Sequence, residues 1–226
     1  MHPRKLAENN FAYLLCALLI FFLLMPVLRV SFQGRDAGLL KDFLPVGFSL
    51  LILVGVWGLQ GNRRLFHLGL TLALVQVGFA VADRIGPAPA LKMGLALNML
   101  AFCVLNAYLG ARHVFSWRRA DTNTLIGAVC VYLLLGFIWA LLYAISAYFL
   151  PDGAFNGLSF DEGIVQFDTF LYYSFVTLTS SGYGDITPVN PLVRTLSYLE
   201  MITGQFYMAI LVAGLVGLFM GKRGGS

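Results

Sequence analysis

Charged residues are scarce in this chain of 226 residues. Asp, Glu, Lys and Arg make up 12% of it, hydrophobic residues make up 59%, and the mean hydropathy is +0.80. A soluble globular protein carries roughly 25% charged residues, so the composition excludes a water-soluble enzyme and indicates a membrane protein. We interpret the net charge of +4 as a topology signal and expect no nucleic-acid partner, because basic residues flank membrane segments.

Cysteine is also rare. Cys16, Cys103 and Cys130 all lie inside apolar runs. Their odd number and their spacing are typical neither of a disulfide framework nor of a metal site. The sequence therefore predicts no cofactor.

Six apolar runs approach or exceed the ~18 residues with which a helix crosses a bilayer. They lie at 11–30, 43–60, 65–82, 91–111, 123–150 and 192–221. A seventh run, 169–179, has about half the spanning length and precedes Gly-Tyr-Gly, so we expect it to enter the bilayer and turn back. The predicted fold is an all-α membrane protein with six transmembrane helices and one re-entrant segment.

The polar loop at 111–121 divides the chain into two predicted domains, a four-helix bundle at 1–115 and a second domain at 121–222. The segments between the predicted helices lie alternately on the two sides of the membrane. One side carries nine basic residues: Arg4, Lys5, Arg63, Arg64, Arg112, Arg118, Arg119, Lys222 and Arg223. The other side carries six: Arg29, Arg35, Lys41, Arg84, Lys92 and Arg194. Because the cytoplasmic side of a membrane protein is the more basic one, both termini are expected in the cytoplasm, with the chain in the cell (inner) membrane.

The most informative segment is 177–185, which reads Thr-Leu-Thr-Ser-Ser-Gly-Tyr-Gly-Asp. A desolvated monovalent cation requires several oxygens at fixed distances without a full negative charge, and backbone carbonyls meet that need. Consecutive carbonyls face one axis when the backbone alternates in handedness, which Gly182 and Gly184 tolerate. Upstream, Asp168 is expected to cap a short helix whose C-terminal end directs partial negative charge toward the same place.

This segment resembles the pore loop of the potassium channel superfamily, whose filter reads Thr-Val-Gly-Tyr-Gly-Asp. The resemblance extends from the helix at 123 through the last helix, in the order helix, pore helix, filter, helix, and is to bacterial channels with one pore loop and six helices. It implies a passive potassium-selective channel with K+ as the permeant ion, and not an enzyme. One chain supplies one column of carbonyls, so we expect a homotetramer in membrane lipid. A regulatory partner is left open.

The resemblance also assigns roles to individual residues. The selectivity filter is Ser180, Ser181, Gly182, Tyr183 and Gly184, with K+ at the first four, and the Ser180 hydroxyl stands at the innermost ion site. Residues expected to support the filter are Thr177, Thr179, Asp185, Tyr172, Tyr173 and Glu200. The expected gating hinge is Gly204, and the residues expected to line the cavity are Gln205 and Met208.

Ser181 departs from the family pattern, which has valine or isoleucine there. Its hydroxyl requires a partner, because an unpaired buried polar group costs about 1 to 3 kcal/mol. A weakly selective monovalent cation channel is therefore an alternative. Val176 is a second departure, since some family members place a carboxyl there that braces the outer aspartate.

Glu200 places a carboxyl at membrane depth, where an unpaired charge is expensive. It is expected to be protonated, hydrogen-bonded behind the filter or wetted by the cavity. We favour contacts with hydroxyls of the pore helix or filter, such as those of Thr177, Thr179 or Ser181.

The fourth apolar run lacks the regularly spaced basic residues of a voltage sensor and has only Lys92, at its start. Each charge that crosses the membrane field contributes about 2.3 kcal/mol per 100 mV, so opening is expected to depend little on voltage. Asn98 and Asn106 share one helical face and are expected to join helices of the front bundle. The gating stimulus is left open.

Gly-Tyr-Gly-Asp also matches the Gly-x-Gly-Asp motif of intramembrane aspartyl proteases. Those enzymes require a second aspartate in a Tyr-Asp pair, which this sequence lacks, and Asp185 precedes Pro188 and Pro191 at a helix start. The protease is therefore a remote alternative. A non-conducting assembly or regulatory subunit is another.

Overall fold

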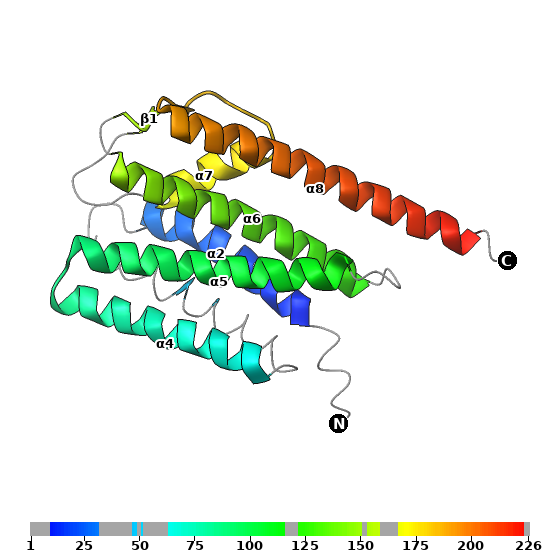
Figure 1. Cartoon of the computed structure of the whole chain (residues 1–226), viewed down its shortest axis with the longest axis horizontal. Coiled ribbons are helices and arrows are strands. Elements are labelled where there is room, and N and C mark those ends of the chain that lie inside the picture. The colour runs from blue at the N-terminus through cyan, green and yellow to red at the C-terminus, as the bar shows by residue number, and fades with distance from the viewer. Residues whose placement is uncertain are drawn as a thin grey trace. The chain divides into compact units, whose positions relative to one another are not determined.

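A computed structural model describes residues 10–31, 47–48, 51, 63–115, 122–150, 153–158 and 167–223. These residues form mostly helices, as predicted: α2 (Asn10–Ser31), α4 (Arg63–Ile85), α5 (Pro89–Phe115), α6 (Thr122–Phe149), α7 (Phe167–Leu178) and α8 (Pro191–Arg223) (Figure 1). Two short strands, β1 (Phe155–Asn156) and β2 (Thr187–Pro188), were not predicted.

Four of the described helices are long and apolar enough to cross a membrane. These spans are Arg63–Ile85, Pro89–Arg112, Asn123–Phe149 and Pro191–Gly214, and a shorter apolar helix covers Phe11–Leu24. The chain is thus an all-α, multi-pass membrane protein. The predicted run at 43–60 lies almost wholly outside the described residues, so six spans remain a prediction.

The described chain divides into two compact units. The first contains α2, α4, α5 and α6 as far as Val131, and the second contains α6 from Tyr132 onward, α7, α8 and both strands. The boundary expected from sequence is the loop at 111–121, whereas the contacts divide the chain within α6. The reason is local: the Phe11 ring packs against α6 at Gly127, and the Phe11 carbonyl accepts from Cys130 Sγ at 3.4 Å.

In the first unit, α4 and α5 lie side by side as an antiparallel pair (Figure 1). Asn98 joins them, because its amide donates to the Leu72 carbonyl at 3.0 Å and to Gln76 Oε1 at 2.7 Å. Asn106 instead donates to the Phe102 carbonyl of its own helix at 2.9 Å. The prediction of a helix-joining role is therefore confirmed for Asn98, while for Asn106 it remains a prediction, because part of the front bundle lies outside the described residues.

The second unit is built around the short helix α7, which packs against α8 (Figure 1). Asp168 is the second residue of α7 and not its cap, because the helix begins at Phe167, two residues earlier than expected. The Phe167 ring is buried and stacks on Phe137 of α6 at 5.9 Å between centroids. At twelve residues α7 is shorter than a membrane span, as the sequence predicted.

Aromatic rings fill the space between α6, α7 and β1. The Tyr173 ring lies 4.9 Å from that of Tyr143 and 5.2 Å from that of Phe155, and Phe155 lies 5.6 Å from Phe170. Their edge-to-face and tilted packing is favourable beyond the apolar area that it buries. This cluster fixes α7 against α6.

The two strands join the chain before α7 to the chain after the filter segment. They pair antiparallel, with Phe155 opposite Pro188 and Asn156 opposite Thr187. Asn190 then caps α8, since its side-chain oxygen accepts from the Leu192 amide at 2.9 Å. The segment 179–186 is therefore held at both ends, by α7 and by β2.

Candidate functional site

The backbone of the filter segment alternates in handedness. The φ angle is positive at Ser180 (57°), Gly182 (55°) and Gly184 (82°), which are every second residue. Glycine adopts this conformation freely, whereas a residue with a side chain is strained there by roughly 1 to 3 kcal/mol. The alternation that the two glycines predict is thus present and begins one step earlier, at Ser180.

The first amides of this segment donate to the last carbonyls of α7. Ser180 N donates to Thr177 O at 2.8 Å, and Ser181 N and Gly182 N donate to Val176 O at 2.9 and 3.3 Å. The described residues contain no cis peptide bond, and in a trans peptide the carbonyl points opposite to the amide that follows it. The carbonyls of Ser180 and Ser181 therefore point away from Val176 and the end of α7.

The two filter serines each have a side-chain partner. The hydroxyls of Ser181 and Thr179 are 2.9 Å apart, and Thr179 also donates to the Phe175 carbonyl at 2.7 Å, so Ser181 is the donor to Thr179. The hydroxyl of Ser180 accepts from Gln205 Nε2 at 3.0 Å. Sequence reasoning identified Thr179 as support but missed the contact of Gln205 with Ser180.

At the far end of the segment, Tyr172 donates to Asp185 Oδ2 at 2.7 Å. This hydrogen bond stabilises the carboxylate and lowers the pKa of Asp185 below its ordinary value. Of the two tyrosines expected to support the filter, only Tyr172 contacts Asp185, because the Tyr173 hydroxyl lies 2.7 Å from Ser197 Oγ on α8.

The loop before α7 packs against the same end of the segment. Gly157 has a φ of +83°, and a side chain there would overlap the backbone oxygen of Asp185. A glycine is therefore required by both conformation and space. Sequence reasoning missed this contact, because the two residues are far apart in the chain.

Glu200 of α8 is fully buried, and its partners differ from those expected. Tyr143 Oη donates to Glu200 Oε2 at 2.5 Å, and Ser174 Oγ lies 2.5 Å from Glu200 Oε1. A hydroxyl of the pore helix does contact Glu200, but it belongs to Ser174 and not to the expected examples Thr177, Thr179 or Ser181. The hydroxyl that meets Glu200 is on α7, as expected, but lies one helical turn before Thr177. Sequence gives no signal for Tyr143, which is 57 residues from Glu200.

Gly204 lies where α8 meets the end of α7. A side chain at this position would collide with the backbone carbonyl of Leu178, and α8 continues through Gly204 as far as Arg223. The contact gives Gly204 a packing role, while its role as a gating hinge remains a prediction. Gln205 and Met208 are exposed, and the cavity that they are expected to line also remains a prediction.

Two membrane-length helices, a short helix between them and a following segment of alternating handedness define a pore-domain arrangement. Residues 124–220 match the family described as an ion channel. The chain is also similar to the voltage-gated potassium channel Kch of Escherichia coli (strain K12), with 24% identity over 214 residues that cover 86% of this chain and 46% of that protein. The chain spans about half the length of that relative. The family match places an ion channel domain at 124–220, and both similarities support the resemblance to the potassium channel superfamily.

Proposed function

We propose that this protein is a passive, potassium-selective channel in which the carbonyls of Ser180, Ser181, Gly182 and Tyr183 replace the water around K+. The observation that carries the proposal is the positive φ at every second residue of 180–184, next to amides that bond α7 and turn the first carbonyls away from it. The bacterial relative is named as a potassium channel, which supports the choice of ion.

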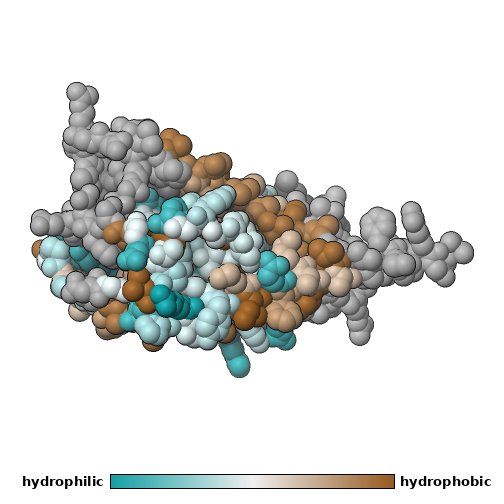
Figure 2. All heavy atoms as spheres, turned by 90° about the horizontal axis from the view of Figure 1, so that it is seen from above, coloured by the Kyte–Doolittle hydropathy of each residue, from teal (hydrophilic) through white to brown (hydrophobic). Residues whose placement is uncertain are grey.

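The proposal requires four copies around one axis, because an ion needs a ring of oxygens. In the single chain the Tyr183 side chain is 73% exposed, and α8 exposes Leu199, Ile202, Phe206 and Ile210. Figure 2 shows apolar residues over part of the viewed face, beside hydrophilic ones. Copies of the chain and membrane lipid are suitable partners for such surfaces.

We also propose that opening depends little on voltage. The relative is described as voltage-gated, but α5 has Lys92 in its first turn, Arg112 near its end and apolar or neutral residues through the middle. Charges at the ends of a helix sense little of the membrane field. A conductance that rises steeply with voltage would contradict this part of the proposal.

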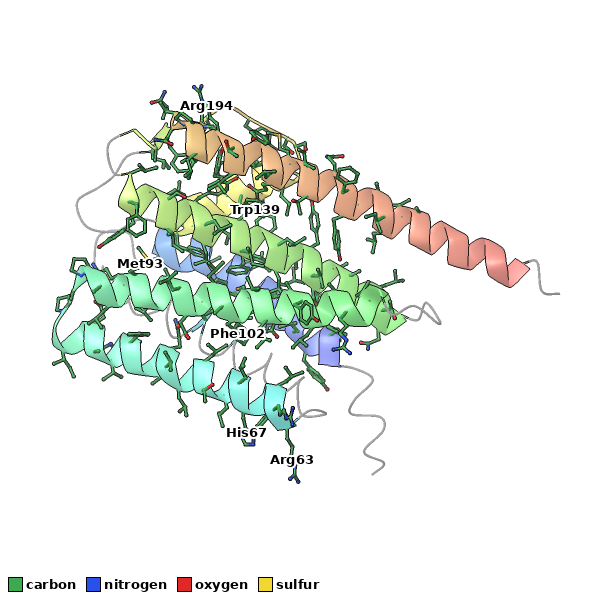
Figure 3. All side chains as sticks on the ribbon, in the orientation of Figure 1. Arg63, His67, Met93, Phe102, Trp139 and Arg194 are labelled. Carbon is green, nitrogen blue, oxygen red and sulfur yellow. The ribbon has the colours of Figure 1, made fainter. Side chains whose placement is uncertain are left out.

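The proposed orientation has both termini on the cytoplasmic side. In the α4–α5 hairpin, Arg63 and Arg64 begin α4 and Arg112 is near the end of α5, so the three share one end of the pair. Arg63 and His67 point away from α4 at that end (Figure 3). A basic end agrees with the cytoplasmic side.

The test is flux from liposomes that contain only the purified protein, with bi-ionic potentials in potassium and sodium. Wild-type protein is expected to pass potassium with a reversal potential that favours it over sodium. Gly184→Ala places a side chain at a φ of 82° and is expected to abolish selective flux, while Gly86→Ala, in open space on the α4–α5 turn, is the control. A reversal potential near zero would favour the weakly selective channel, and no flux would favour a regulatory subunit.

The protease alternative depends on Asp185. This residue is exposed, accepts a hydrogen bond from Tyr172 and precedes β2 and α8, whereas a catalytic aspartate of that class shares a proton with a second carboxylate. Cleavage of a membrane peptide that Asp185→Asn abolishes would revive this alternative.

A further inference from the structure

Three buried polar side chains form a chain of contacts behind the filter segment. Tyr143 on α6, Ser174 on α7 and Glu200 on α8 are all 0% exposed. Tyr143 Oη lies 2.5 Å from Glu200 Oε2, Glu200 Oε1 lies 2.5 Å from Ser174 Oγ, and Ser174 Oγ lies 2.8 Å from the carbonyl oxygen of Gly136 on α6. The chain of contacts therefore ties α7 to both neighbouring helices.

The number of hydrogens decides which form of Glu200 fits these contacts. The Gly136 carbonyl only accepts, so Ser174 gives its single hydrogen to it, and Ser174 then needs a hydrogen from Glu200. Tyr143 donates to the other carboxyl oxygen. A protonated Glu200 makes three hydrogens available for three contacts, whereas an ionised Glu200 leaves two hydrogens for three contacts.

We propose that Glu200 carries a proton and that this form positions α7, and with it the filter, by joining α7 to α6 and α8. The proposal rests on the proposed channel function. Loss of the proton removes one of the three hydrogen bonds and leaves a buried negative charge on Glu200. The groups that bond Glu200 are hydroxyls, and none of them is a cation that could neutralise this charge. The amides of Ser180, Ser181 and Gly182 donate hydrogen bonds to carbonyls at the end of α7. A shift of α7 would therefore also move the filter segment.

Within the part of the chain that the structure describes, the titratable side chains that interact with Glu200 are phenols. They are Tyr132 and Tyr143 on α6 and Tyr173 on α7, and the Tyr173 hydroxyl lies next to Ser197 of α8. An ordinary phenol stays neutral until about pH 10. A variant that keeps all three tyrosines and replaces only Glu200 therefore separates the response of the carboxyl from that of the phenols.

Glu200→Gln is that variant, because a glutamine amide donates and accepts like a protonated carboxyl but does not ionise. Wild-type flux is expected to fall strongly from neutral to alkaline pH, whereas Glu200→Gln is expected to keep the neutral-pH flux across the same range. Ser174→Ala is expected to lower flux at every pH. A folded Glu200→Gln tetramer with the wild-type pH profile, or without flux at neutral pH, overturns the proposal.

A second measurement does not require conduction. Infrared spectra of the purified protein at neutral pH are expected to contain the carbonyl band of a protonated carboxyl that Glu200→Gln lacks, and this band is expected to disappear at alkaline pH together with a fall in the melting temperature. Absence of the band at neutral pH overturns the proposal. If the band is present while wild-type protein passes no ions at any pH, the channel function fails and the protonation of Glu200 stands.

Discussion

The α4–α5 pair and the unit of α6, α7 and α8 accommodate buried polar groups differently. In the α4–α5 pair, the Asn98 amide bonds Gln76 and the Leu72 carbonyl. These are two long helices whose backbone groups form hydrogen bonds within each helix. In the second unit, hydroxyls and a carboxyl surround a helix of twelve residues whose end leaves the helical path. Irregular backbone at membrane depth requires protein partners, so the polar contacts gather where α7 ends.

The largest expected difference between the two regions is at glycine. Gly204→Ala forces a methyl group into the Leu178 carbonyl of the second unit, and such overpacking costs about 1 to 3 kcal/mol or more. Gly78→Ala on α4 meets nothing within 4 Å and is expected to stabilise the protein by up to about 1 kcal/mol. Melting temperatures in detergent measure both, and equal effects would remove the distinction.

Serine provides the next comparison. Ser174→Ala leaves Glu200 short of one partner and is expected to cost about 1 to 3 kcal/mol of stability. Ser146→Ala removes only a 2.7 Å bond to the Leu142 carbonyl of its own helix, and about 0.5 to 1.5 kcal/mol is the upper range for such a loss. Thermal unfolding and flux are measured together, and a greater loss for Ser146→Ala would contradict the role of Ser174.

The amide pair of the front helices is expected to contribute less. Asn98→Leu leaves Gln76 buried without the 2.7 Å bond and is expected to cost about 0.6 kcal/mol, the average measured for hydrogen bonds between membrane helices, and at most about 1.7 kcal/mol. Adding Gln76→Leu is expected to recover part of that loss, and potassium selectivity is expected to stay unchanged in both variants. A changed reversal potential would show that the front pair acts on the filter.

The smallest expected effect is at Asp185, where the Tyr172 hydrogen bond lowers the pKa. The ionised Asp185 contributes to stability above the ordinary pKa of aspartate, and this contribution is lost as pH falls through the lowered pKa of Asp185 in the folded protein. Tyr172→Phe is therefore expected to raise the pKa of Asp185 and to shift acid sensitivity to higher pH. Nuclear magnetic resonance titration of the carboxyl measures this, with exposed Tyr198→Phe as control, and an unchanged pKa would exclude Tyr172 as the cause.

Much of the filter segment was predictable, because its geometry is local. The glycines at 182 and 184 predict a positive φ at two positions two residues apart. The hydroxyl at 181 requires a hydrogen-bond partner, and Thr179 provides it. Tyr172 and Tyr173 were both expected to support the filter, and the structure shows that Tyr172 is the one that bonds Asp185. The bond of Asn106 to its own helix was not predicted, because periodicity places a side chain on a face but does not tell whether that side chain bonds the i−4 carbonyl.

The sequence by itself determined that the chain is a membrane protein, where most of its helices lie and where the backbone must alternate, because hydrophobicity and glycine conformation act over a few neighbouring residues. Only the tertiary structure decided that Glu200 meets Tyr143 and Ser174, that Gln205 bonds Ser180 and that β1 pairs with β2. These contacts join residues 25 to 57 positions apart or strands separated by α7. Side-chain identity states what each group can bond, whereas helix packing determines which groups meet.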